Sequence, residues 1–207
     1  MIKMSEKEVV LAHFKKVDPK LLKIMMEINF KDWLSEEILD EKLIFNSLCR
    51  TIVGQQLAGK AADAIFKRFE SLMENEITPE NVMSTEEQKI RDVGLSWAKV
   101  RSVKDLSARV LDKSLVLENL EGMSNEDLIN ELSKVRGIGR WTAEMFLMFR
   151  LGREDIFSWG DLGLKNGLKK YLEKDDLMKV EMEEVVSSWA PYRTYGAIAM
   201  WHLLDNR

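Results

Sequence analysis

The chain of 207 residues has one cysteine, Cys49, and two histidines, His13 and His202. A single thiol cannot form an intramolecular disulfide, and it cannot hold an iron–sulfur cluster or a zinc site that needs several thiolates. The two histidines lie far apart in the sequence, so a histidine-based metal site has too few ligands. We therefore expect a reducing compartment, no iron–sulfur cluster and no catalytic cofactor.

Long uncharged apolar runs are also missing. No stretch reaches the roughly 18 apolar residues that a membrane span requires, so we expect no membrane association. The opening residues, MIKMSEKEVVLAHFKK, predict an amphipathic helix and not a signal peptide. These features lead us to expect a cytoplasmic, nucleoid-associated protein or, in a nucleated cell, a nuclear one.

A strong net charge is absent as well. The formal net charge is −4, with charges of both signs making up 32% of the residues. The overall charge therefore neither favours nor excludes a polyanionic partner. A local count is more informative, because residues 133–170 contain eight basic and four acidic side chains. A phosphate-binding face is compatible with this chain.

Period-two strand patterns are absent, and almost every segment has helical periodicity. Asp18 and Pro19 predict a capped helix start, and Ser84 with Glu87 predicts a capping box. The apolar pattern over 41–73 is broken by two glycines, Gly54 and Gly59, which predicts two successive helices meeting near 55–59. We predict an all-α fold of many short helices.

The stretch KVRGIGRWTAEMF (134–146) places Gly137 and Gly139 between two helical patterns. A helix–loop–helix with glycines at the turn leaves backbone amides accessible at the start of the second helix. Those amides and the helix dipole favour an anion, for which a DNA phosphate is the natural candidate. The simpler interpretation is that the glycines only end one helix and open the next.

Four ordered motifs together resemble the helix-hairpin-helix superfamily of DNA glycosylases, and specifically its alkyladenine (DNA-3-methyladenine glycosylase II) branch. The motifs are IVGQQLAGKAADAIFKRF (52–69), LSKVRGIGRWTAEMFLMF (132–149), DLGLKNGL (161–168) and WAPYRTYGAIAMWHLL (189–204). The resemblance implies a compact all-helical form with two lobes, without the N-terminal β-rich domain of some relatives. We expect a middle lobe over about 40–125, and a second lobe from 1–39 plus 126–207 that carries the hairpin and the catalytic aspartate.

The resemblance implies that Asp161 is the catalytic carboxylate. A carboxylate at a helix N-terminus is favoured in its ionised form, which would stabilise positive charge on the sugar and orient a water. Relatives commonly have a proline just before this aspartate, whereas this chain has SWG at 158–160. The position where many relatives carry a Schiff-base lysine is Trp141 here, so we expect a monofunctional enzyme without lyase activity. A plain N-cap without chemistry is the alternative for Asp161.

The resemblance also suggests further site residues, grouped by role. Aromatic side chains would attract and stack on a cationic alkylated purine, and wedge residues would fill the gap left by the flipped nucleotide. Backbone carbonyls of the hairpin would hold a sodium or potassium ion. The candidates are Trp141, Trp201, Trp159, Tyr192 and Tyr195 for the base pocket; Lys134, Arg136, Gly137, Gly139, Arg140 and Thr142 for DNA binding; Gln55, Gln56 and Leu57 for the wedge; and Ser133, Val135 and Ile138 for the ion.

These features predict a monomeric, monofunctional glycosylase that removes alkylated purines from double-stranded DNA in base excision repair. One alternative is a glycosylase for deaminated or oxidised purines such as hypoxanthine or 8-oxoguanine. Another is a non-catalytic helix-hairpin-helix module that only binds DNA. Trp33, Trp97 and Trp189 are expected to be core residues. Arg193 has two open interpretations, a phosphate contact or a lock on the C-terminal helix.

Overall fold

The computed structural model describes residues 6–34, 40–118 and 120–205, and all regular elements in these ranges are helical. This confirms the predicted all-α class. None of the helices described is long and apolar enough to cross a membrane. The chain divides into two compact units, which we call unit 1 (Met1–Glu36 and Leu147–Arg207) and unit 2 (Glu37–Phe146).

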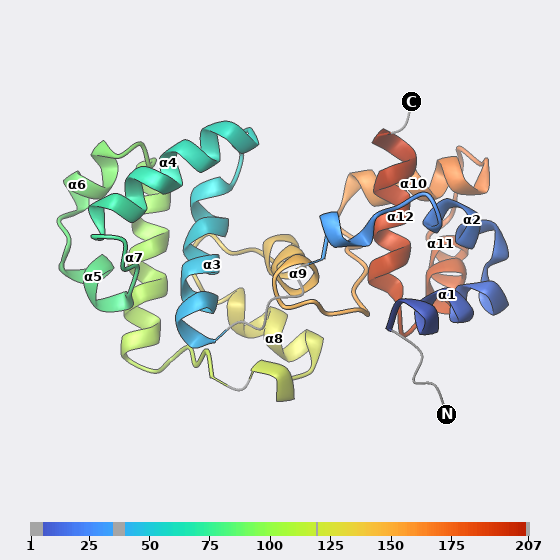
Figure 1. Cartoon of the computed structure of the whole chain (residues 1–207), viewed down its shortest axis with the longest axis horizontal. Coiled ribbons are helices and arrows are strands. Elements are labelled where there is room, and N and C mark those ends of the chain that lie inside the picture. The colour runs from blue at the N-terminus through green and yellow to red at the C-terminus, as the bar shows by residue number, and fades with distance from the viewer. Residues whose placement is uncertain (1–5, 35–39, 119, 206–207) are drawn as a thin grey trace. The chain divides into compact units, whose positions relative to one another are not determined.

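Figure 1 labels the helices of both units. Unit 1 contains α1 (Glu6–Val17), α2 (Pro19–Met25), the 3-10 helix η1 (Phe30–Asp32), α10 (Leu162–Leu172), α11 (Lys179–Ser188) and α12 (Arg193–Asp205). Unit 2 contains α3 (Glu41–Gly54), α4 (Gly59–Leu72), α5 (Pro79–Ser84), α6 (Glu87–Asp92), α7 (Trp97–Leu111), the 3-10 helix η2 (Leu120–Gly122) and α8 (Asn125–Leu132). The remaining helix, α9 (Arg140–Phe149), begins in unit 2 and ends in unit 1.

The division places residues 126–146, and with them α8 and most of α9, in unit 2. We had expected these residues to belong to the lobe that carries Asp161. The physical reason lies in the contacts of the hairpin loop, because the Arg136 amide donates to Asp105 of α7 and Gln55 donates to the Gly137 carbonyl. Non-local hydrogen bonds of this kind leave no periodic signature in the sequence.

Several helix ends follow the predicted local chemistry. The Asp18 carboxylate accepts a hydrogen bond of 3.0 Å from the Leu21 amide, with Pro19 at the first position of α2. Helix α3 ends at Gly54 and α4 begins at Gly59, as expected. The Ser84 capping box was wrong, because Ser84 is the last residue of α5 and α6 is preceded by Glu86 without a side-chain cap.

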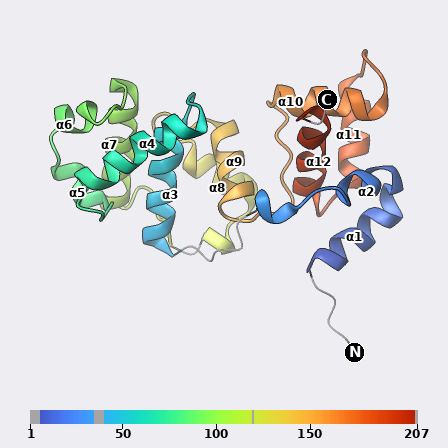
Figure 2. The same ribbon diagram turned by 45° about the horizontal axis from the view of Figure 1, so that its top comes forward.

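The core of unit 1 forms around α12, which lies beside α10 in both Figure 1 and Figure 2. The two helices approach closely at Gly167, where an added Cβ would stand 2.7 Å from the Met200 carbonyl oxygen. The fully buried Trp189 donates its indole N–H to Asp18 over 2.9 Å, and the Tyr171 hydroxyl donates to the same carboxylate. Burial and the neighbouring Asp18 together raise the pKa of Tyr171 well above its usual range.

The core of unit 2 forms where α7 packs against α5, α6 and α3. Its buried side chains are large and apolar, among them Phe45, Leu48, Phe69, Val103 and Leu106. Cys49 is also fully buried here, and burial raises the pKa of its thiol far above the usual value. This thiol therefore lacks the thiolate character that a nucleophile needs.

Candidate functional site

The glycine loop between α8 and α9 depends on Gly137 for two separate reasons. Its φ of +82° lies in the left-handed region, and an added Cβ would stand 2.5 Å from the Ser102 hydroxyl oxygen on α7. Gly139 has neither restriction, since a Cβ added there would meet no described residue within 4 Å apart from its chain neighbours. The Gly139 carbonyl accepts from the Ala143 amide, so the chain enters α9 at this residue. The amides of the first turn of a helix have no partner within the helix, which makes this end suited to an anion.

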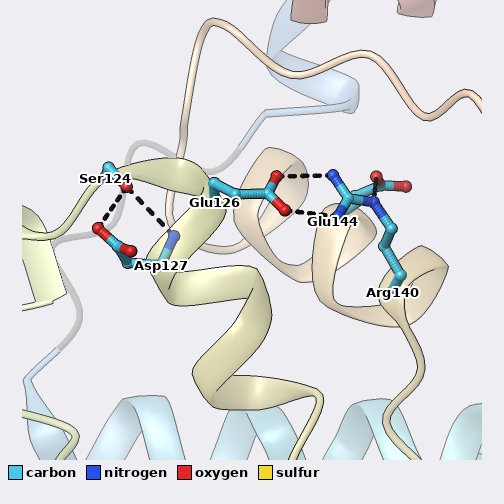
Figure 3. Close-up of polar contacts among 5 residues, drawn as sticks. All are labelled: Ser124, Glu126, Asp127, Arg140 and Glu144. Carbon is cyan, nitrogen blue, oxygen red and sulfur yellow. Dashed lines mark hydrogen bonds and ion pairs between the residues drawn. The ribbon is translucent and has the colours of Figure 1, made fainter.

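The arginine that opens α9 is held by two glutamates (Figure 3). The Arg140 guanidinium makes a bidentate pair with Glu126 of α8, with both N–O distances 2.7 Å, and its Nε donates to the buried Glu144 over 3.0 Å. The hydrogen bond to Glu126 raises the pKa of the Arg140 guanidinium, whereas burial lowers it. The hydrogen bond has the larger effect, so the pKa is raised. The same bond lowers the pKa of Glu126.

The other predicted DNA contacts of the hairpin differ in how they are engaged. Lys134 pairs with Glu131 over 2.6 Å on the surface. Thr142 is buried, and its hydroxyl lies 3.4 Å from the Gln55 amide nitrogen. Arg136 donates only its backbone amide to Asp105, and within the ranges described no ion pair involves its exposed guanidinium. Arg136 is therefore the basic side chain of this loop best placed to receive a phosphate.

The predicted wedge lies on the turn between α3 and α4. Gln56 has a φ of +57° and is exposed, and Leu57 is 37% exposed. Gln55 instead donates its side-chain amide to the Gly137 carbonyl over 2.8 Å. The turn thus presents Gln56 and Leu57 outward, while Gln55 joins the turn to the hairpin loop.

A lysine that the sequence analysis did not identify supports this turn. The Lys99 ammonium, on α7, donates 2.8 Å hydrogen bonds to the carbonyls of Val53 and Gln55. These carbonyls lie at the C-terminal end of α3, where a cation is favourable. Partial burial lowers the pKa of Lys99. No spacing rule connects Lys99 to residue 55, so only the fold shows this contact.

The candidate catalytic carboxylate, Asp161, is the N-cap of α10 in unit 1. Its Oδ1 accepts from the Leu164 amide at 2.8 Å and from the Trp201 indole N–H at 3.2 Å. The residue is partly exposed, so solvent has access to it. A carboxylate with this placement can stand opposite a developing positive charge on a substrate.

Aromatic rings gather beside this carboxylate. Trp201 stacks parallel to Trp33, with centroids 6.2 Å apart, and Phe149 lies 5.8 Å from Trp201. The prediction that Trp33 and Trp97 are core residues was wrong, because Trp33 is only half-buried and Trp97 is 42% exposed. Trp33 and Phe149 were missed because they are remote in sequence from Asp161, and an isolated aromatic residue carries no positional signal.

The other predicted pocket aromatics are placed differently. Trp159 packs on Phe157, with centroids 4.7 Å apart. Tyr192 and Tyr195 flank the start of α12, where their rings contact those of His13 and Phe30, respectively. The Tyr195 hydroxyl also donates to Glu154 over 2.8 Å, so this side chain is held by contacts with η1 and with the chain before α12. Trp141 is the second residue of α9, in unit 2, and is 49% exposed.

Arg193 locks the start of α12 to the chain before it. Its guanidinium donates to both oxygens of Asp155, at 2.6 and 2.7 Å. Burial alone would raise the pKa of Asp155, but the hydrogen bonds and charge of Arg193 outweigh it and the pKa is lowered. The structure therefore favours the locking interpretation of Arg193.

Comparisons with known proteins agree with this geometry. The family model described as HhH-GPD superfamily base excision DNA repair protein matches residues 49–191. The chain is 36% identical to DNA-3-methyladenine glycosylase 1 of Schizosaccharomyces pombe over 79% of this chain and 73% of the relative. The solved DNA-3-methyladenine glycosidase of Bacillus halodurans is similar with a TM-score of 0.79 and 31% identity, covering 96% of this chain and 88% of that one. The S. pombe 3-methyladenine DNA glycosylase Mag1, solved in complex with abasic DNA, has a TM-score of 0.73 and 31% identity, covering 93% and 94%.

Proposed function

Because the chain belongs to the HhH-GPD superfamily of base excision DNA repair proteins, we propose that it is a monofunctional DNA glycosylase that hydrolyses the N-glycosidic bond of alkylated purines. The observation that carries the proposal is the position of Asp161. This carboxylate caps α10 and is bound by an indole N–H within an aromatic cluster. The relatives named as DNA-3-methyladenine glycosylases support the same substrate class.

The proposed reaction begins with extrusion of the damaged nucleotide from the duplex. The hairpin loop would hold the backbone through first-turn amides of α9 and through Arg136, without reading sequence. Gln56 and Leu57 would fill the space that the flipped nucleotide leaves. Both elements belong to unit 2, where Gln55 connects them.

Bond cleavage then depends on the carboxylate. As the N-glycosidic bond lengthens, positive charge builds on the sugar, and an ionised Asp161 stabilises it electrostatically. The same carboxylate would orient the water that attacks the sugar. A 3-methyladenine or 7-methylguanine base is cationic, so an aromatic face contributes attraction as well as stacking. The family resemblance matches Trp141 to the position where lyases carry a lysine, and an indole cannot form a Schiff base, so the proposed product is an abasic site.

The sodium or potassium ion of the hairpin is a proposal that comes from the family resemblance. The carbonyls of Ser133, Val135 and Ile138 belong to the loop between α8 and α9, and carbonyl oxygens are suitable ligands for sodium or potassium. The Val135 carbonyl accepts from the Ile138 amide at 3.0 Å, which fixes the turn between two of these residues. The residues present therefore fit a monovalent cation.

We further propose that the protein works as a monomer wherever the cell keeps its DNA, in a nucleoid or a nucleus. Its substrate is double-stranded DNA that contains damaged bases.

The test is release of free bases from methylated duplex DNA, resolved by chromatography, for the wild type, Asp161→Asn and Asp40→Asn. Asp40 is a matched control because it caps α3 in the same way, accepting from the Leu43 amide at 2.8 Å. Asparagine caps about as well as aspartate, so neither variant should lose much stability. We expect Asp161→Asn to lose at least about 100-fold in rate while binding DNA, since an amide cannot supply the negative charge. Asp40→Asn should match the wild type.

Two results would redirect the proposal. A wild type that binds DNA but releases no methylated, deaminated or oxidised base would support the non-catalytic module. A wild type that releases hypoxanthine or 8-oxoguanine in preference to methylpurines would replace the substrate class and leave the role of Asp161 intact.

A further inference from the structure

The catalytic carboxylate and the C-terminal helix share a hydrogen bond that the base-pocket role of Trp201 does not explain. An aromatic wall needs only its π-face, yet the Trp201 Nε1–H points to Asp161 Oδ1 at 3.2 Å. The Leu164 amide donates to the same oxygen at 2.8 Å. Two donors from different helices converging on one oxygen restrict the rotation of the carboxylate.

The space for this bond exists because residue 163 is a glycine. A Cβ at Gly163 would stand 2.9 Å from Asp161 Oδ1 and 3.1 Å from Trp201 Nε1, so it would intrude on both ends of the hydrogen bond. Gly163 has no positive φ, so backbone conformation does not demand a glycine here. Because Gly163 has no side chain, the Asp161 carboxylate and the Trp201 indole can come into hydrogen-bond contact.

The plane of the indole is fixed from another direction by Trp33. The two rings are parallel within 1°, and their centroids are 6.2 Å apart. Aromatic pairs in direct offset-stacked contact have ring centroids about 4.5–7 Å apart, and this pair lies within that range. No base fits between Trp33 and Trp201, so Trp33 supports the orientation of Trp201 and does not form the opposite wall of a base sandwich. Phe149 contacts both indoles in the same cluster.

We propose that Trp201 is a positioning residue for Asp161, and that Gly163 and Trp33 keep its indole N–H on the carboxylate. The proposal rests on the proposed glycosylase function, in which Asp161 faces the sugar. A carboxylate held in advance needs no reorganisation as charge develops, which is the general basis of electrostatic preorganisation. Because the sugar is the same for every substrate, loss of this bond should slow excision of all bases by the same factor.

The experiment compares two variants. Trp201→Phe keeps an aromatic face but removes the N–H. Gly163→Ala keeps both the Asp161 carboxylate and the Trp201 indole but pushes them apart. The matched control is Gly160→Ala, because a Cβ added at Gly160 would meet no residue in the described part of the chain within 4 Å apart from its chain neighbours. Single-turnover excision and DNA affinity are measured on duplexes that carry cationic 3-methyladenine or 7-methylguanine, or neutral hypoxanthine or ethenoadenine. Thermal melting followed by circular dichroism checks that each variant folds.

We expect both Trp201→Phe and Gly163→Ala to slow the single-turnover rate about 10- to 100-fold, the range for a hydrogen bond to a charged group. The factor should be equal for every base that the wild type releases, with DNA affinity unchanged. Gly160→Ala should match the wild type.

Three results would overturn the inference. One is an unchanged rate in Trp201→Phe, which suffices even if Gly163→Ala fails to fold. Another is a loss confined to the cationic bases, which would make Trp201 a stacking surface only. The third is a loss of DNA affinity with an unchanged rate. A wild type that releases no base would instead refute the proposed function, so the two failures are distinguishable.

Discussion

The N-termini of α9 and α10 offer the same helix-dipole field and use it in opposite ways. No acidic residue occupies the first turn of α9, whose start is formed by Gly139 and Arg140. At α10 the chain supplies its own anion, Asp161, as the cap. A helix end without an acidic cap can accept an external phosphate, whereas one capped by aspartate holds a carboxylate in its ionised form. In the proposed function, this one physical effect serves DNA binding in unit 2 and catalysis in unit 1.

A change that distorts the loop before α9 should have a large effect on stability and on DNA affinity. Gly137→Ala would strain a backbone at φ +82° and place a Cβ 2.5 Å from the Ser102 hydroxyl oxygen. We expect a loss of about 2–3 kcal/mol in the free energy of unfolding and at least tenfold in DNA affinity. Thermal melting and fluorescence anisotropy with labelled duplex measure the two quantities. Gly139→Ala is the matched control, and an equal loss in that variant would contradict the account.

A smaller effect on stability and excision rate should follow from removing the lysine that supports the turn between α3 and α4. Lys99→Met removes the donor to the Val53 and Gln55 carbonyls while keeping a side chain of similar length. We expect about 1–2 kcal/mol of lost stability, and a slower excision rate because the turn that carries Gln56 and Leu57 is less well held. Single-turnover kinetics and urea denaturation are the measurements. Full stability with an unchanged rate would show that the hydrogen bonds of Lys99 are dispensable.

The smallest effect is expected from a change that strengthens binding. Glu126→Gln removes the charge that neutralises Arg140, leaving the buried Glu144 as its partner. The guanidinium can then interact with phosphate more favourably, so DNA affinity should rise about two- to fivefold at low salt, with a steeper salt dependence. Anisotropy titrations at several salt concentrations give both values. If affinity falls, the pair between Arg140 and Glu126 is needed to shape the hairpin.

The fold class and the starts of α9 and α10 could be predicted from the sequence, because the signals for helix periodicity and helix ends are local. A cap such as Asp161 or Asp18 acts within three residues, and a helix break at Gly54 needs only its neighbours. The predicted capping box at Ser84 was wrong because the motif is local. It does not reveal that the preceding helix, α5, continues through Ser84.

Contacts between distant segments could not be predicted. Trp33 against Trp201, and Lys99 against the end of α3, both depend on how the helices fold back on one another. The charge count over the hairpin region correctly identified basic residues, but it could not show that Arg140 is held by Glu126 and Glu144. Side-chain pairing, not composition, decides which of these cations is available to a phosphate.

The most direct test of the division between the two helix starts is single-turnover excision of 7-methylguanine as a function of enzyme concentration, for Gly137→Ala and Asp161→Asn. The account predicts that Gly137→Ala needs more enzyme but reaches the wild-type rate at saturation. Asp161→Asn should saturate at the wild-type concentration with a rate at least about 100-fold lower. If both variants lost only saturating rate, or both lost only DNA affinity, binding and chemistry would not be divided between α9 and α10. The central claim would then be wrong.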